Sequence, residues 1–218
     1  MNNILSNSTY SKCDINCLED KLPKNWRKVF EKKEFVERKE KMIELWKDIC
    51  GEELSLVINF LQQNLLDIEL VKNKDIYSVL YKFKNDKNEI LYYQGVIPNE
   101  KNDNMLLEKL PQEVSKFYKY LHNGFFEFNY PDTGIISIEN VECLDDYEWG
   151  VIEDLNLHLN LDLSTSYSLF SSGAGGYVVI DLNKKSLNEA IIWFAKKEPL
   201  YDRMYWDFVD EWLLMCMN

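Results

Sequence analysis

Residues 76–96 read IYSVLYKFKNDKNEILYYQGV, and they give the clearest structural signal in the chain. Two runs rich in aromatic and β-branched residues, 76–83 and 90–96, flank the polar segment NDKN. Such runs favour extended strands, because their bulky side chains pack well on a pleated surface. Short segments rich in Asn and Asp favour turns. The stretch therefore predicts a β-hairpin.

On the N-terminal side of the hairpin, apolar residues recur at helical spacing. They predict one helix over residues 26–50, which Gly51 ends, and a second helix over residues 52–66. The first of these contains the charged run EKKEFVERKEK, in which basic and acidic residues alternate. Alternating charges are typical of a solvated helix face, and they argue against a nucleic-acid patch.

On the C-terminal side, the pattern predicts further helices and strands. One helix is expected from Pro111 to the pair Asn123-Gly124, and a last helix from about Arg203. Extended segments are expected between them, at residues 125–128, 166–170, 177–182 and 190–195, and residues 135–141 form a further apolar piece.

The polar segment PNEKNDN, residues 98–104, is the best candidate for an internal boundary. It separates a stretch with two predicted helices and a hairpin from the helix that begins at Pro111. We therefore expect an N-terminal helical and β-hairpin region over residues 1–103. A second domain is expected over residues 104–218.

Charge is distributed unevenly along the chain. The sequence has 25 Lys plus Arg and 37 Asp plus Glu, a net charge of −12. Residues 1–109 hold 18 basic and 19 acidic side chains, a net −1, whereas residues 110–218 hold 7 and 18, a net −11. An acidic surface repels nucleic acid and anionic membranes, and it attracts a basic partner. The acidity of the second half therefore predicts a surface that binds a basic protein.

Composition argues against membrane, disulfide and metal classes. No apolar run approaches the roughly 20 residues that a membrane-spanning helix needs, and the N-terminus lacks the apolar segment of a secretory signal, so we expect a cytoplasmic location. The five Cys are odd in number and scattered, which does not indicate a disulfide framework. The two His and the Cys do not form a zinc-ligand pattern, and no metal or cofactor is expected.

The stretch DDYEWGVIED, residues 145–154, places two large aromatic residues inside a cluster of carboxylates. Aromatic anchors surrounded by charge are typical of protein interfaces. An equally weighted interpretation is that the aromatics are core residues and the acids are merely solvated. The candidate partner-binding residues are Asp145, Asp146, Tyr147, Glu148, Trp149, Glu153 and Asp154.

A second acidic group lies near the C-terminus. A solvated helix face is the favoured interpretation of its residues at helical spacing, Asp207, Asp210 and Glu211. The other two members of the group are Glu198 and Asp202.

Catalytic interpretations are weaker. The GAGG segment at residues 173–176 precedes a predicted strand, whereas phosphate loops precede helices, so a structural turn is expected. His122 is expected to cap a helix and His158 to face solvent, and no Ser lies in a nucleophile elbow. We therefore predict that the protein is not an enzyme; a small hydrolase using paired carboxylates is the less favoured alternative.

The order of signals in the second half resembles the SUKH superfamily, which includes the Smi/Knr cell-wall regulators and many bacterial immunity proteins. Each piece is degenerate alone, and the resemblance lies in their order and spacing. The pieces are Leu110-Pro111 with Phe117 and Tyr118, the stop at Asn123-Gly124, GGYVVIDL ending at Asp181, the strand AIIWF, and a last helix with Phe208, Val209 and Leu213.

The resemblance implies an α+β fold with a central, mostly antiparallel sheet flanked by helices. It also implies a role without catalysis, in which an immunity protein binds and neutralises a cognate polymorphic toxin of bacterial competition. A basic nuclease-type toxin would suit the acidic surface. A regulatory adaptor of the same fold is the alternative, and either role is compatible with a homo-oligomer.

Overall fold

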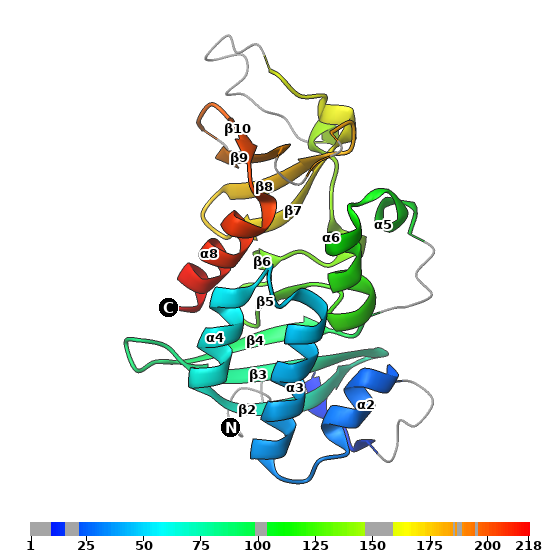
Figure 1. The fold of residues 1–218 in the computed structure, drawn as a ribbon, viewed down its shortest axis with the longest axis vertical. Helices are drawn as coiled ribbons and strands as arrows, with labels where there is room; N and C mark the ends of the chain where they lie inside the picture. Colours follow the sequence, from blue (N-terminus) through cyan, green and yellow to red (C-terminus); the bar gives the residue numbers. More distant parts are fainter. Residues whose placement is uncertain are drawn as a thin grey trace.

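The computed structural model describes residues 10–15, 22–98, 104–146, 159–184, 186, 189–194 and 196–218. In these residues, ten strands form one antiparallel sheet whose spatial order follows the chain (Figure 1). The α+β fold with a central antiparallel sheet is thereby confirmed. The strands are β1 (Tyr10–Lys12), β2 (Leu65–Asn73), β3 (Ile76–Lys84), β4 (Ile90–Val96), β5 (Phe125–Glu127), β6 (Thr133–Ile135), β7 (Ser166–Ser172), β8 (Gly176–Asp181), β9 (Ala190–Phe194) and β10 (Leu200–Arg203).

The first two predicted helices differ from those in the structure, and α5 (Met105–Lys109) was not predicted. The single helix expected over residues 26–50 is two helices, because the chain turns at residues 31–34. The helix expected over residues 52–66 ends at Asn64, and the next residue starts β2. The α-helices are α2 (Lys24–Phe30), α3 (Phe35–Cys50), α4 (Ser55–Asn64), α5 (Met105–Lys109), α6 (Gln112–Lys116) and α8 (Tyr205–Met217).

Helices α3, α4 and α8 lie across one face of the sheet (Figure 1). Alternate residues of each strand point to this face, as the two-residue period of a strand requires. On β3, for example, Val79, Tyr81 and Phe83 belong to the main core together with apolar residues of these helices. No described helix is long and apolar enough to span a membrane.

The opposite side of the sheet, here called the open face, carries two small apolar clusters. One consists of Val71, Leu80 and Tyr92, packed against Tyr10 and Phe128. The other lies on β8 and β9 around Trp193 and contacts residues from loops and short 3-10 turns. Neither cluster contains a residue of a described α-helix. The open face is therefore the side on which the sheet itself forms much of the surface.

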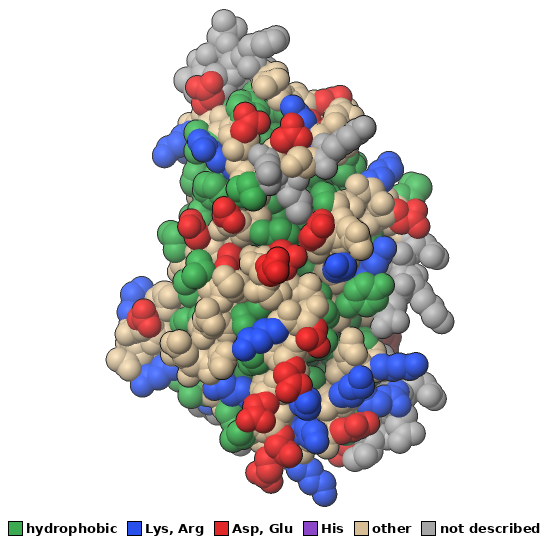
Figure 2. Space-filling model, viewed as in Figure 1, with side chains coloured by type: hydrophobic (Ala, Val, Ile, Leu, Met, Phe, Trp, Pro, Cys, Tyr) green, Lys and Arg blue, Asp and Glu red, His purple; other side chains and the backbone are tan. Residues whose placement is uncertain are grey.

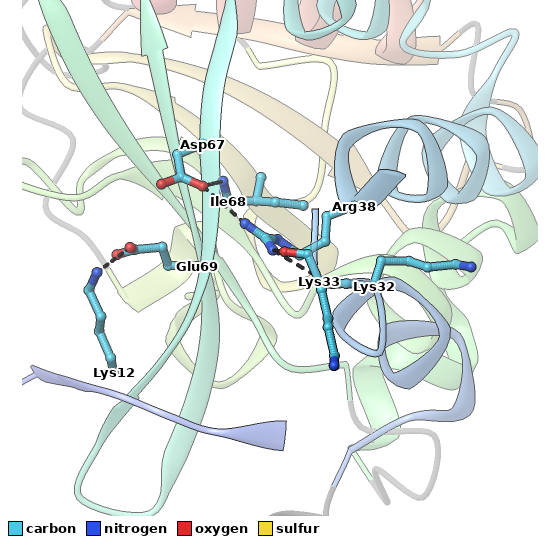
Figure 3. A network of polar contacts seen from close by, with 7 residues as sticks. All are labelled: Lys12, Lys32, Lys33, Arg38, Asp67, Ile68 and Glu69. Atoms are coloured by element: carbon cyan, nitrogen blue, oxygen red, sulfur yellow. Dashed lines mark hydrogen bonds and ion pairs between the residues drawn. The ribbon is translucent and has the colours of Figure 1, made fainter. Parts of the chain in front are cut away.

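Ion pairs tie the N-terminal elements to the sheet edge (Figure 3). Arg38 of α3 donates to the carbonyl oxygen of Lys33 at 2.6 Å and lies 3.6 Å from Asp67 of β2. The guanidinium thus holds the turn between α2 and α3 against β2. Lys12 of β1 pairs with Glu69 of β2. Two basic residues of this half are thus paired with carboxylates of β2.

The predicted boundary near residue 103 falls between two paired strands. Residues 93–95 of β4 pair with residues 125–127 of β5. The main core also includes residues from both sides, among them Tyr81 and Phe125, whose ring centroids are 5.3 Å apart. The sheet and the core are therefore continuous from one half to the other, and the division into residues 1–103 and 104–218 stays a prediction.

Asp210 joins α8 to α4. Its carboxylate accepts hydrogen bonds from the backbone N–H groups of Leu56 at 2.8 Å and Val57 at 2.9 Å. Both groups lie in the first turn of α4, which has no side-chain cap of its own. Asp210 is buried, whereas Asp207 and Glu211 are exposed. The expectation of a solvated face is therefore wrong for Asp210, because a helix N-terminus needs a hydrogen-bond acceptor there.

We expect Asp210→Ala to lower the free energy of unfolding by about 2 kcal/mol, because it leaves two N–H groups of α4 without an acceptor. Asp207→Ala, on an exposed position of the same helix, is the matched control and should change stability by less than about 0.5 kcal/mol. Urea unfolding monitored by tryptophan fluorescence measures both. Equal stabilities of the two variants would contradict the capping role.

Candidate functional site: an acidic groove on the open face

Two adjoining cavities of about 440 and 470 Å³ form a groove on the open face. The first is lined by residues from β5 to β8, and the second by residues from β1 to β5. The cavities meet at four shared residues, Phe126, Ser137, Glu139 and Asn140.

The floor of the groove is the sheet itself. Gln94 of β4 is buried, and its side-chain amide donates to Ser78 Oγ of β3 at 2.9 Å. Phe126 of β5 lies directly opposite Gln94 in the strand register. Ser171 of β7 and Tyr177 of β8 are paired in the same way further along. The floor thus offers both aromatic rings and hydrogen-bonding groups.

One wall of the groove is the segment 136–143, which leaves β6 and follows β7. It begins with a hydrogen bond from Ile136 N to Leu169 O and ends where Cys143 pairs with Tyr167. Because this segment is irregular, Glu139 and Glu142 stay exposed and line the cavity.

Asn123 and Gly124 hold this wall in place. The Asn123 side chain accepts from Ile138 N at 3.0 Å and donates to Glu139 Oε2 at 2.7 Å. Gly124 has a φ of +91°, and a Cβ there would lie 2.6 Å from Ser137 Oγ. Only glycine allows this conformation and this close approach. The Asn-Gly pair that ends the preceding helix therefore also orients a carboxylate of the groove.

The groove is acidic along its length. Asp75 lines one end, Glu139 lies in the shared middle, and Asp132 and Glu142 line the other end. The described residues that line the two cavities include no Lys or Arg. Asp75 is partly offset by Lys72, whose Nζ lies 3.6 Å away. Such a surface attracts cations, and an ionic contact formed inside a groove is less screened than one on a flat surface.

The sequence contains a signal for this groove that the charge balance of the two halves does not show. Residues 120–183 contain 11 Asp or Glu and no Lys or Arg. Asp132, Glu139 and Glu142 lie in this stretch, but their spacing matches neither a helix nor a strand. Composition alone could have indicated this acidic stretch. The pairing of the strands, which brings its carboxylates into one groove, is not visible in the sequence.

The predicted partner-binding residues are described only in part. Asp145 and Asp146 are exposed on a 3-10 turn, Leu144–Asp146, that directly follows the groove wall and is anchored by buried Leu144. They follow Glu142 closely in the chain but line neither cavity. The other predicted residues lie outside the described residues, and they are Tyr147, Glu148, Trp149, Glu153 and Asp154.

The helix-covered face has a different charge pattern. Figure 2 shows side chains of both signs intermixed over α2 and α3, while acidic side chains gather around α8. The ion pairs formed between described residues lie between positions 12 and 75. The second half therefore carries its excess of carboxylates on both sides of the sheet. Only those on the open face line the groove described above.

Two features considered for chemistry have structural roles. The GAGG segment is a turn between β7 and β8, with φ of +70° at Gly173 and +80° at Gly175, as expected. His122 ends the helix as predicted, but its side chain is fully buried in the core. His158 lies outside the described residues. Among the described residues, no group of three or more His, Cys, Asp or Glu could hold a metal ion.

Comparisons with protein-family models, with curated proteins and with solved structures find no match to this chain. The similarity to the SUKH superfamily rests on the sequence pattern alone and stays a prediction.

Proposed function

We propose that the protein binds a basic protein toxin and neutralises it, as an immunity protein of bacterial competition does. The observation that supports this proposal is the groove on the open face, in which four carboxylates and no Lys or Arg occur among the described lining residues. Asp145 and Asp146 add two exposed carboxylates in the turn that directly follows the groove wall. The protein would act in the cytoplasm without a cofactor, by occupying a surface of the toxin.

The physical argument concerns the toxin's own requirement. A nuclease holds phosphate with Lys and Arg, so its active cleft is basic. An acidic inhibitor is drawn to that cleft over long distances, which raises the association rate at low salt. The same acidity keeps the inhibitor away from nucleic acid. Binding and steering require no reacting group on the inhibitor, which fits a protein without catalytic function.

The first test is co-expression with the product of the adjacent gene. If that product is a toxin, we expect this protein to co-purify with it and to restore growth of the host cells. Co-purification without rescue would favour the regulatory adaptor. Absence of both binding and rescue, with the neighbour shown to be toxic, would contradict the proposal.

We expect the triple variant Asp145→Lys, Asp146→Lys and Glu148→Lys to associate with the toxin at least tenfold more slowly at low salt. The reason is that reversal replaces attraction by repulsion in this acidic stretch of the sequence. A matched control reverses Glu37 and Glu40, which are exposed on α3 in the charge-balanced half. Stopped-flow association rates between 50 and 500 mM salt measure the effect. An unchanged rate and salt dependence would exclude these residues from the interface.

A further inference from the structure

The groove has the length of an extended peptide segment. The part that carries the carboxylates runs across the sheet from Asp75, directly before β3, to Tyr177 on β8. Five interstrand spacings separate these strands, and each spacing is 4.7–4.9 Å, so the distance is about 24 Å. An extended chain advances about 3.4 Å per residue. The groove therefore accommodates about seven residues of extended chain.

The carboxylates are distributed along this length and are not gathered at one point. Asp75 lines only the cavity near β3, and Asp132 and Glu142 line only the cavity near β8. Glu139 belongs to both cavities. A single cation would meet only part of this set. Several cations at intervals along one chain would meet all of it.

The spacing of side chains on an extended chain matches such a distribution. Residues i and i+2 point to the same side and lie roughly 7 Å apart, so three of them cover about 14 Å. The aromatic rings of Phe126 and Tyr177 line the same groove. Arg and Lys pack their alkyl portions and cationic groups against such rings. The floor thus suits long basic side chains that enter from one side of a strand-like segment.

We propose that the groove binds an extended segment of a protein partner, about seven residues long, with Arg or Lys at alternate positions. This inference rests on the proposed function and specifies the part of the partner that the open face recognises. Alternation places every cation toward the carboxylates. The same cations in consecutive positions would point to both sides, and only part of them would reach the groove.

Two peptides of equal composition test the inference. The first is acetyl-Gly-Arg-Gly-Arg-Gly-Arg-Gly-amide, and the second has the three Arg residues in consecutive positions between pairs of Gly. We titrate each into the full ¹⁵N-labelled chain and follow the amide signals by NMR. We expect the alternating peptide to bind at least fivefold more tightly, with the largest shifts at Gln94, Asn123, Glu139 and Glu142. A third peptide, with citrulline in place of Arg, should not bind.

The variant Glu139→Gln/Glu142→Gln should weaken binding of the alternating peptide at least fivefold. Gln keeps the size of Glu and can still accept the hydrogen bond from Asn123, so the groove wall is retained. Glu37→Gln/Glu40→Gln on α3 is the matched control and should bind the peptide as the unaltered chain does. Equal affinity for the two Arg peptides, or shifts confined to α8, would overturn the inference.

The outcomes separate this inference from the proposed function. If the peptides do not bind while the co-expressed toxin does, the proposal of an extended basic segment is contradicted and the immunity role is supported. The converse outcome is a toxic neighbour that neither binds nor is neutralised, while the alternating peptide binds as described. That outcome supports the peptide-binding groove and contradicts the immunity role.

Discussion

Gly95→Ala is expected to lower the free energy of unfolding by about 3 kcal/mol, at the upper end of the usual range for overpacking a core. A Cβ at position 95 would lie within 2.6 Å of three atoms of the His122 ring, Nδ1, Cε1 and Cγ. Real Cβ atoms do not approach other heavy atoms so closely. Either the ring or strand β4 must move, and both are buried.

The His122 ring cannot move without disturbing its neighbours. Its Nε2 lies 2.6 Å from Tyr81 Oη, which also accepts a hydrogen bond from Trp46 Nε1 at 3.0 Å. The Tyr81 hydroxyl therefore joins the Trp46 and His122 rings through hydrogen bonds. The ring also stacks on Phe125, with an interplanar angle of 17°. The absence of a side chain at Gly95 is therefore part of how this core packs.

Thermal unfolding followed by circular dichroism measures the effect, and we expect the midpoint to fall by about 6–12 °C. Gly175→Ala is the control, because no heavy atom lies within 4 Å of a Cβ there, although φ is +80°. That variant bears only the backbone strain of a left-handed residue, about 1 kcal/mol. If both variants lose the same stability, the contact with His122 is not the cause.

The sequence predicted the strands well where each strand has its own apolar pattern. The hairpin of β3 and β4 and the strands β7, β8 and β9 lie where alternating or continuous apolar runs occur. β2 was missed because Leu65 continues the helical stripe of α4. The pairing of β2 with β3, which the sequence does not display, decides that Leu65 is extended.

Buried polar residues were the least predictable. Asp210 has the spacing of an exposed acid on α8, yet its partners Leu56 and Val57 lie more than 150 residues earlier in the chain. His122 follows an amphipathic helix, and nothing local shows that a π-helical turn at Phe117–Leu121 directs it into the core. In both cases the deciding contact is distant in sequence.

The candidate site was predictable in charge and not in shape. The acidity of the second half indicated Asp145 and Asp146, which are exposed at the end of the groove wall. Glu139 and Glu142 were not predicted, because their place depends on how Asn123 holds the segment beside β7. The sequence thus locates the acidic stretch, whereas only the fold shows which of its carboxylates line the groove.

Stability is expected to decrease as the pH falls below 6.5, by up to about 1.4 kcal/mol per pH unit, because of His122. Burial lowers the pKa of His122 to about 3 in the folded protein, whereas the unfolded chain has the ordinary value of 6.5. Between these values the unfolded state binds the proton and the folded state does not. The stability contributed by neutral His122 is therefore complete above pH 6.5 and is lost progressively towards pH 3.

The physical cause is burial, which removes the charged imidazolium form from water. His122 Nε2 is engaged with Tyr81, and Nδ1 has no hydrogen-bond partner of normal geometry. An interaction with the Val96 backbone favours the charged form, but burial among Trp26, Trp46 and Phe125 outweighs it. An imidazolium would be a buried charge without a carboxylate to pair with it among the described contacts, and such a charge is costly.

The measurement is urea unfolding at intervals from pH 7 to pH 5, above the range in which most carboxylates titrate. The sequence has two His, so His158→Gln provides a background in which His122 is the only imidazole. In that background, His122→Phe should flatten the slope of stability against pH, even if it lowers stability at pH 7 because Tyr81 loses a hydrogen-bond partner. An unchanged slope would show that His122 is protonated in the folded state and that the core accommodates its charge. The slope tests the titration separately from packing, because Phe fills nearly the same space and cannot bind a proton.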